Sequence, residues 1–141
     1  MNIRNTSSVI PVTGYAGDVS PELAWHWVQS GEAVLVDVRS DAEREWVGFV
    51  PGAVPLTWKQ WPGMALNQSF DDAIQAAVPA GQKAVLLCRS GVRSIAAAKS
   101  ATALGLEAYN ILEGFEGDAD AEGHRGSRGG WRHRGLPWRQ N

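Results

Sequence analysis

Two short apolar runs, each followed by a helix signal, constrain the fold of this chain more than any other feature. The first is Ala33-Val34-Leu35-Val36-Asp37-Val38 and the second is Ala84-Val85-Leu86-Leu87. Aliphatic, β-branched runs of this length are typical of strands that are buried on both faces of a parallel sheet. Strands that alternate with helices indicate βα units. We therefore expect an α/β protein, an open parallel-sheet sandwich with helices on both faces.

Helix signals follow both runs, and another precedes the first. Ser20-Pro21 predicts a helix start, with serine as N-cap and proline in the first turn, and Gly31 predicts its end. Directly after the first run, Ser40-Asp41-Ala42-Glu43 has the pattern of a capping box and predicts a second helix. The other expected elements are a turn and short strand over 51–56, helices over 69–78 and 94–104, and a last strand over 108–112.

Size and composition restrict the classes of protein to which the chain can belong. Its 141 residues favour one domain with a sizeable core, which we place at residues 15–141, behind a flexible N-terminal arm over 1–14. A formal net charge of −2 argues against a general nucleic-acid binder. No stretch approaches the roughly 20 apolar residues of a membrane span, and the first residues lack the apolar core of a signal peptide. We therefore expect a cytoplasmic protein that contacts neither nucleic acid nor membrane.

The chain contains a single cysteine, Cys88, which directly follows the second apolar run. One cysteine excludes an intramolecular disulfide and a metal site built from cysteines alone. Ligands of parallel sheets bind beyond the carboxyl ends of the strands, so Cys88 falls at the edge where a binding site is expected. The three histidines are scattered without metal-ligand spacing. We therefore expect chemistry that needs neither a metal nor a cofactor.

The segment from Cys88 to Ser94, Cys-Arg-Ser-Gly-Val-Arg-Ser, joins the second apolar run to the next predicted helix. The backbone N–H groups of such a loop, together with the helix dipole, favour anions. Arg89 and Arg93 add two positive charges, and all three effects favour a thiolate over a thiol at Cys88. A buried structural cysteine is the alternative, but an apolar pocket would not tolerate both arginines unpaired. We therefore predict Cys88 as a nucleophile, with a binding loop formed by Arg89, Ser90, Gly91, Val92 and Arg93, in which Gly91 allows a positive φ.

Four segments of the chain together resemble the rhodanese family of sulfurtransferases. Leu35–Arg39 is similar to the family's strand that ends in Asp-x-Arg, and Glu45–Ala53 is similar to its Gly-His-Ile-Pro-Gly-Ala motif. Cys88–Ser94 is similar to its active-site loop, and Trp131–Pro137 is similar to its closing Trp-x-x-x-Gly-Leu-Pro motif. Phe49 stands where the family usually has a histidine, and about a dozen extra residues form an expected loop insertion at 117–130. The resemblance implies a rhodanese-like fold.

Loop length separates two chemistries that the resemblance allows. Related phosphatases use a Cys-x5-Arg loop, which is wide enough for a phosphoryl group. Here the arginine of that pattern is replaced by Ser94, and Arg93 gives Cys-x4-Arg instead. The smaller loop suits a single sulfur atom on the cysteine. A sulfurtransferase is therefore favoured over a phosphatase or an arsenate reductase.

The resemblance implies a two-step covalent mechanism. The Cys88 thiolate takes the sulfane sulfur of a small anionic donor such as thiosulfate and becomes a persulfide. A thiol, cyanide or a protein acceptor then removes the outer sulfur. Arg89 is expected to bind the donor because its charge suits an anion.

Four further residues are expected to support the loop. Arg93 should pair with a carboxylate, for which Asp37 and Glu45 are the candidates, and Arg39 and Ser94 complete the supporting set. The alternative function is a non-catalytic or regulatory rhodanese module that docks a partner protein through the insertion. Retention of the cysteine and both loop arginines favours the enzyme.

Two patterns near the C-terminus resemble motifs that have other functions. Asp118–Gly123 resembles the first half of a calcium loop, but Gly129 stands where the bidentate glutamate is needed, so no metal site is expected. Arginines interleaved with Trp131 and Trp138 are also found in RNA-binding segments. The tryptophan motif better fits a terminal helix packed on the domain.

Overall fold

A five-stranded parallel sheet forms the centre of the computed structural model, which describes residues 8–60, 63 and 65–140. Its strands lie in the order β1-β7-β6-β2-β3, and each neighbouring pair is parallel. The apolar runs form the two central neighbours, paired from Ala33 opposite Lys83 to Asp37 opposite Leu87. The strand bounds are β1 (Gly17–Val19), β2 (Ala33–Asp37), β3 (Val54–Pro55), β6 (Lys83–Leu87) and β7 (Glu107–Ile111).

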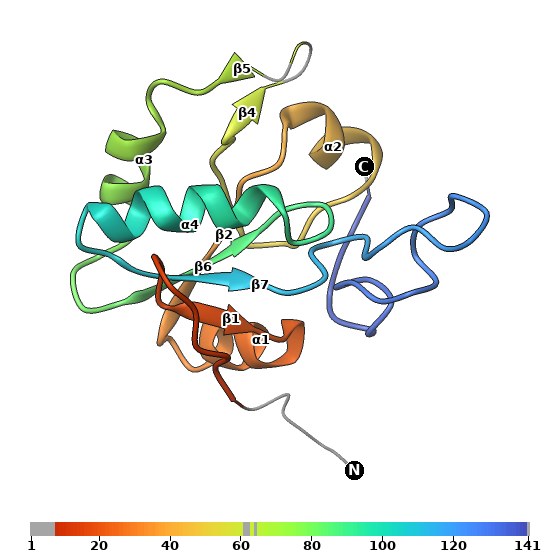
Figure 1. Cartoon of the computed structure of the whole chain (residues 1–141), viewed down its shortest axis with the longest axis horizontal. Coiled ribbons are helices and arrows are strands. Elements are labelled where there is room, and N and C mark those ends of the chain that lie inside the picture. The colour runs from red at the N-terminus through yellow and green to blue at the C-terminus, as the bar shows by residue number, and fades with distance from the viewer. Residues whose placement is uncertain (1–7, 61–62, 64, 141) are drawn as a thin grey trace.

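Four helices and one small antiparallel hairpin accompany the sheet in the described residues (Figure 1). Two of the predicted caps form as expected. The Ser20 hydroxyl accepts a hydrogen bond from Leu23 N at 3.0 Å, and Ser40 and Glu43 make both bonds of the capping box. The bounds are α1 (Pro21–Gln29), α2 (Asp41–Trp46), α3 (Phe70–Ala77), α4 (Arg93–Ala103), β4 (Lys59–Gln60) and β5 (Ala65–Leu66).

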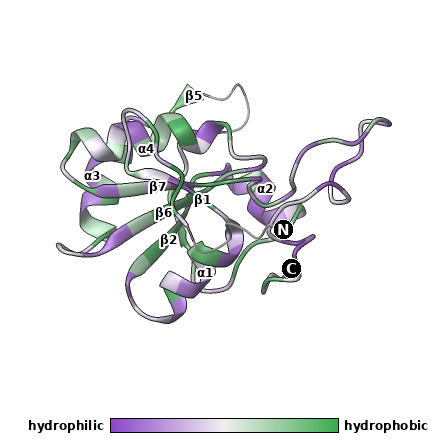
Figure 2. Ribbon diagram, turned by 60° about the horizontal axis from the view of Figure 1, so that its bottom comes forward, coloured by the Kyte–Doolittle hydropathy of each residue, from purple (hydrophilic) through white to green (hydrophobic). Residues whose placement is uncertain are grey.

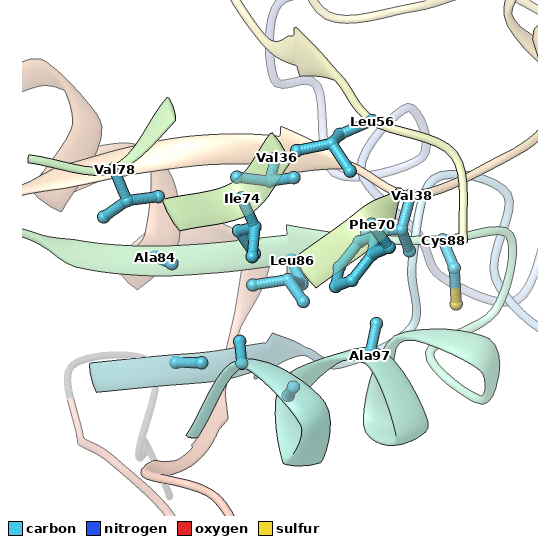
Figure 3. Packing of buried hydrophobic residues seen from close by; sticks show 13 residues of the cluster. Val36, Val38, Leu56, Phe70, Ile74, Val78, Ala84, Leu86, Cys88 and Ala97 are labelled. Carbon is cyan, nitrogen blue, oxygen red and sulfur yellow. The ribbon is translucent and has the colours of Figure 1, made fainter. Parts of the chain in front are cut away.

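Two hydrophobic clusters, one on each face of the sheet, account for the sandwich. Alternate residues of a strand point to opposite faces, so Val36 and Leu86 pack under α3 and α4, whereas Leu35 and Val85 pack against α1 and the C-terminal segment. Figure 3 shows the first cluster, with Cys88 at one end. In Figure 2 the strand β2 is largely hydrophobic, while the long segment after β7 is mostly neutral to hydrophilic. The expected parallel α/β sandwich with helices on both faces is therefore confirmed.

The N-terminal region holds a strand that the sequence did not predict. β1 has only three residues and forms the edge of the sheet, where it pairs with β7. Ile10 exchanges backbone hydrogen bonds of 2.8 and 3.0 Å with Asp18, so contact with the sheet begins within the predicted arm over 1–14. Residues 1–7 of that arm lie outside the described residues.

The predicted terminal helix is wrong. The stretch from Trp131 to Gly135 is a series of turns, and no helix lies between Gly117 and Gln140. Gly129, Gly130 and Gly135 adopt positive φ, which interrupts right-handed helical backbone. Trp131 is nevertheless fully buried, edge-on to Trp25 with ring centroids 5.8 Å apart. The tryptophan motif therefore packs on the domain as expected, but through turns.

Candidate active site

Cys88 lies at the carboxyl end of β6, the middle strand of the sheet, where the loop to α4 begins. Its side chain is buried, with 1% of the residue exposed. The sulfur accepts a hydrogen bond from Gly91 N at 3.1 Å, and the Ser94 hydroxyl oxygen lies 3.1 Å away from it. The backbone therefore turns round the sulfur and directs an N–H group at it, as an anion-binding loop requires.

The chain after β7 clamps the outside of this loop. Phe115 N donates to Cys88 O at 2.8 Å, and Glu116 N donates to Arg89 O at 2.9 Å. A Cβ on Gly114 would lie 2.5 Å from Cys88 O, so only glycine allows this approach. Gly91 adopts a φ of +94°, which agrees with its predicted conformational role.

Arg93 binds Glu43, rather than Asp37 or Glu45 as the sequence led us to expect. Its guanidinium donates to both carboxylate oxygens at 2.7 and 2.6 Å. Glu45 is exposed, and Asp37 is bonded to Arg39 instead. Glu43 and Glu45 lie about 200° apart around the helix, so only one can face the loop. The capping box, which turns Glu43 back toward Ser40, was the sequence signal for this pairing.

The charge of Glu43 is strongly stabilised. Burial alone would raise its pKa, but the hydrogen bonds from Arg93 and the Ser40 N–H and the positive charge of Arg93 outweigh burial and lower the pKa from 4.5 to about 2. The hydrogen bond to Glu43 in turn raises the pKa of Arg93. The pair therefore remains ionised throughout the neutral and mildly acidic range, and it ties the end of the loop to α2.

Asp37 and Arg39 form a second, fully buried ion pair behind the loop. Arg39 donates to the Asp37 carboxylate at 3.0 and 2.7 Å and to Gly48 O at 2.7 Å. Its guanidinium also lies 4.3 Å from the Phe115 ring centroid. These contacts fix the chain between α2 and β3 and support Phe115, which anchors the loop. The pair therefore connects the end of β2 to the segments that follow α2 and β7.

A buried hydrogen-bond chain continues from the sulfur away from the pocket. The Ser94 hydroxyl donates to Asn110 Oδ1 in β7, and Asn110 Nδ2 donates to Asp18 Oδ1 at 3.0 Å. Tyr15 also donates to Asp18, at 2.8 Å; burial, followed by this bond, raises the pKa of Tyr15 to about 12. Asp18 thus fixes the orientation of the Asn110 amide, so that the amide oxygen faces Ser94 and accepts the hydrogen bond from its hydroxyl. Asn110 and Asp18 were not predicted, because no local pattern links β1 and β7 to the loop.

An open cavity of about 920 Å³ lies over Cys88. Arg89, Ser90, Val92 and Arg93 of the predicted loop line it, so the loop residues and the sulfur share one space. Residues from four other places in the chain complete the lining, and the sequence did not identify them as site residues: Ser40, Ala42, Glu43 and Val47 in and around α2, Lys59 in β4, Glu116 after β7, and Arg125 in the insertion.

Two sequence features lie away from this cavity. Phe49, which stands in place of the family histidine, pairs through its backbone with Arg139 and lines a separate cavity of about 310 Å³. In the acidic segment, Asp120, Glu122 and His124 bring ligand atoms within 4.8 Å of one another. The Asp120 carboxylate already accepts hydrogen bonds from the backbone of Glu122 and His124, which explains this proximity.

Fold and site together define a class of protein: a parallel α/β domain with a cysteine held in a loop at the carboxyl end of the middle strand. Comparison with known proteins identifies the family. A model of the Rhodanese-like domain matches residues 20–121. The chain therefore belongs to the rhodanese-like domain family.

Three relatives illustrate this membership. The chain is similar to the crystal structure of Rv0390 from M. tuberculosis, with 45% identity, a TM-score of 0.81, and coverage of 90% of this chain and 99% of that one. It is 34% identical over 116 residues to an uncharacterized protein of Rickettsia conorii, covering 79% of this chain and 86% of the relative. It is also 31% identical over 121 residues to the thiosulfate sulfurtransferase GlpE of Actinobacillus succinogenes, covering 85% and 87%.

None of the helices among the described residues combines the length and the apolar character that crossing a membrane requires.

Proposed function

We propose that this protein is a sulfurtransferase that carries sulfane sulfur on Cys88. The observation that supports the proposal most directly is the arrangement round the sulfur: Gly91 N points at it, and Arg93 faces Glu43 in a loop one residue shorter than the Cys-x5-Arg loop of phosphatases. A thiosulfate sulfurtransferase among the relatives agrees with this chemistry.

In the first step the Cys88 thiolate attacks the sulfane sulfur of thiosulfate. A new S–S bond forms at Cys88, the S–S bond of the donor breaks, and sulfite leaves with the bonding electron pair. The product is a Cys88 persulfide anion. The Gly91 N–H and the start of α4, where no side chain caps the first turn, stabilise this anion.

In the second step a thiolate or cyanide attacks the outer sulfur. The acceptor leaves as a persulfide or thiocyanate, and the Cys88 thiolate returns with the electron pair of the broken S–S bond. Arg89, exposed on the rim of the cavity, binds the anionic donor. Because Cys88 is the only cysteine, no internal thiol can resolve the persulfide, and the sulfur must leave to an outside acceptor. A reducing compartment keeps such a thiol free, and we propose the cytoplasm as the site of the reaction.

Incubation with thiosulfate followed by intact-mass measurement tests the proposal. The wild-type protein should gain one sulfur atom and lose it on addition of cyanide or a thiol, whereas Cys88→Ser should gain none. Hydrolysis of p-nitrophenyl phosphate without sulfur gain would instead identify a phosphatase. Absence of both activities in a folded protein would favour the non-catalytic module that docks a partner.

A further inference from the structure

The cavity over Cys88 is much larger than the proposed donor requires. A thiosulfate ion occupies on the order of 100 Å³, given that one water takes about 30 Å³. The cavity measures about 920 Å³, which lies in the range of pockets that hold whole organic ligands. The cavity is therefore large enough for a reactant bigger than thiosulfate, and the other reactant of this mechanism is the sulfur acceptor, which enters after sulfite has left.

Unpaired positive charge surrounds that space. Of the four cationic side chains in the lining, Arg93 is neutralised by Glu43, while Lys59, Arg89 and Arg125 have no carboxylate partner among the described residues. These three come from separate places: β4, the Cys88 loop and the insertion. The Glu116 carboxylate, which has no cationic partner among the described residues, offsets only one of the charges. The cavity therefore favours a ligand with more than one negative group.

Arg125 is held at the cavity by its surroundings. It donates from Nη1 to Gly117 O at 2.7 Å. The insertion is anchored at both ends by Glu113, which accepts from Gly117 N through its backbone and from Gly130 N through its carboxylate, at 2.9 and 2.8 Å. Glu113 directly precedes the segment that clamps the Cys88 loop, and Figure 1 shows the insertion leaving the sheet there. The insertion and the catalytic loop thus share one support.

The lining of the cavity also includes apolar side chains. Ala42 and Val47 line it from α2, and Val92, which is 70% exposed, lines it from the loop. An exposed aliphatic side chain beside a reactive sulfur offers a surface for the carbon atoms of a ligand. A ligand that offers anionic groups to the cationic side chains and carbon atoms to the apolar ones is an organic acid rather than an inorganic ion.

From these features we infer that the sulfur acceptor is a small organic thiol with two or more carboxylates, and that Arg125 and Lys59 bind those carboxylates. The inference rests on the proposed sulfur transfer and assigns the insertion a role in it. Arg89 serves the donor in the first step. Arg125 and Lys59 act in the second, when the acceptor thiolate must be held against the outer sulfur of the Cys88 persulfide.

Steady-state kinetics with thiosulfate as donor and two acceptors test this assignment. Mercaptosuccinate supplies two carboxylates, and 2-mercaptoethanol is a neutral control. Arg125→Ala should raise the KM for mercaptosuccinate by about tenfold, the scale of one lost charge-assisted hydrogen bond, and change the KM for 2-mercaptoethanol by less than about twofold. Lys59→Ala should act in the same direction. Arg128→Ala is the matched control, because Arg128 is an exposed arginine of the same insertion outside the cavity lining.

The possible results separate this inference from the proposed function. Equal effects of Arg125→Ala on both acceptors, or an equal effect of Arg128→Ala on mercaptosuccinate, would overturn the acceptor assignment. Sulfur loading from thiosulfate, followed by intact mass in the absence of acceptor, reports on the first step alone. If the variants load normally and the acceptor KM values do not change, only the inference fails; if the wild-type protein does not load, the proposed function fails.

Discussion

Replacing Glu43 by glutamine removes the charge that holds Arg93 while keeping the size of the side chain. The pKa of Glu43 falls from 4.5 to about 2 in the folded protein, and each unit corresponds to about 1.4 kcal/mol. The full shift would amount to roughly 3 kcal/mol, and because the side chain is 19% exposed we expect a loss of about 2–3 kcal/mol at pH 7. Urea unfolding followed by tryptophan fluorescence measures this loss.

The pH dependence of the effect identifies its cause. A carboxyl whose pKa is lowered by folding stabilises the protein above its unfolded pKa and loses that contribution as the pH falls toward the folded value. Between pH 7 and pH 3.5 the unfolded chain therefore takes up a proton at Glu43 while the folded protein does not. The stability difference between wild type and Glu43→Gln should shrink by roughly 1 kcal/mol over this range.

Glu45→Gln is the matched control, because Glu45 lies two residues further along α2 and is exposed. It should change the free energy of unfolding by less than about 0.5 kcal/mol. Equal destabilisation by the two substitutions would refute the role of the Arg93–Glu43 pair. So would a loss at Glu43 that stays constant between pH 7 and pH 3.5.

Two further substitutions test the support of the loop. Gly114→Ala places a methyl group 2.5 Å from Cys88 O, so we expect a loss of about 1–3 kcal/mol in unfolding free energy and slower sulfur loading; normal loading would show that the clamp does not shape the loop. Asn110→Leu removes the hydrogen bonds that Asn110 makes with Ser94 and with Asp18 and should cost about 1–3 kcal/mol in urea unfolding, whereas a neutral effect would contradict the hydrogen-bond chain.

The sequence predicted those parts of the fold whose signals are local. The runs at 33–38 and 84–87 formed the central strands because their composition alone requires burial on two faces. β1 was missed because Gly17–Val19 has no pattern of its own and depends on pairing with β7. The prediction of a terminal helix was wrong because the glycines of the C-terminal segment adopt positive φ in turns that hold Trp131.

In the site, too, the sequence predicted what depends on local signals and missed what depends on contacts between distant segments. The position of Cys88 and the course of the loop followed from a strand, a glycine and a helix start in immediate succession. The partner of Arg93 required knowledge of which face of α2 points at the loop, which only the capping bond of Glu43 signalled. Asn110 and Arg125 reach the site through long-range packing, so no spacing in the sequence could identify them.

Sulfur loading at Cys88 is the measurement that tests the central claim most directly. Wild-type protein and Cys88→Ser are each incubated with thiosulfate and compared by intact mass, before and after addition of a thiol. The account predicts one additional sulfur atom on the wild type, its removal by the thiol, and no gain on Cys88→Ser. No gain on folded wild-type protein, or an equal gain on Cys88→Ser, would contradict it.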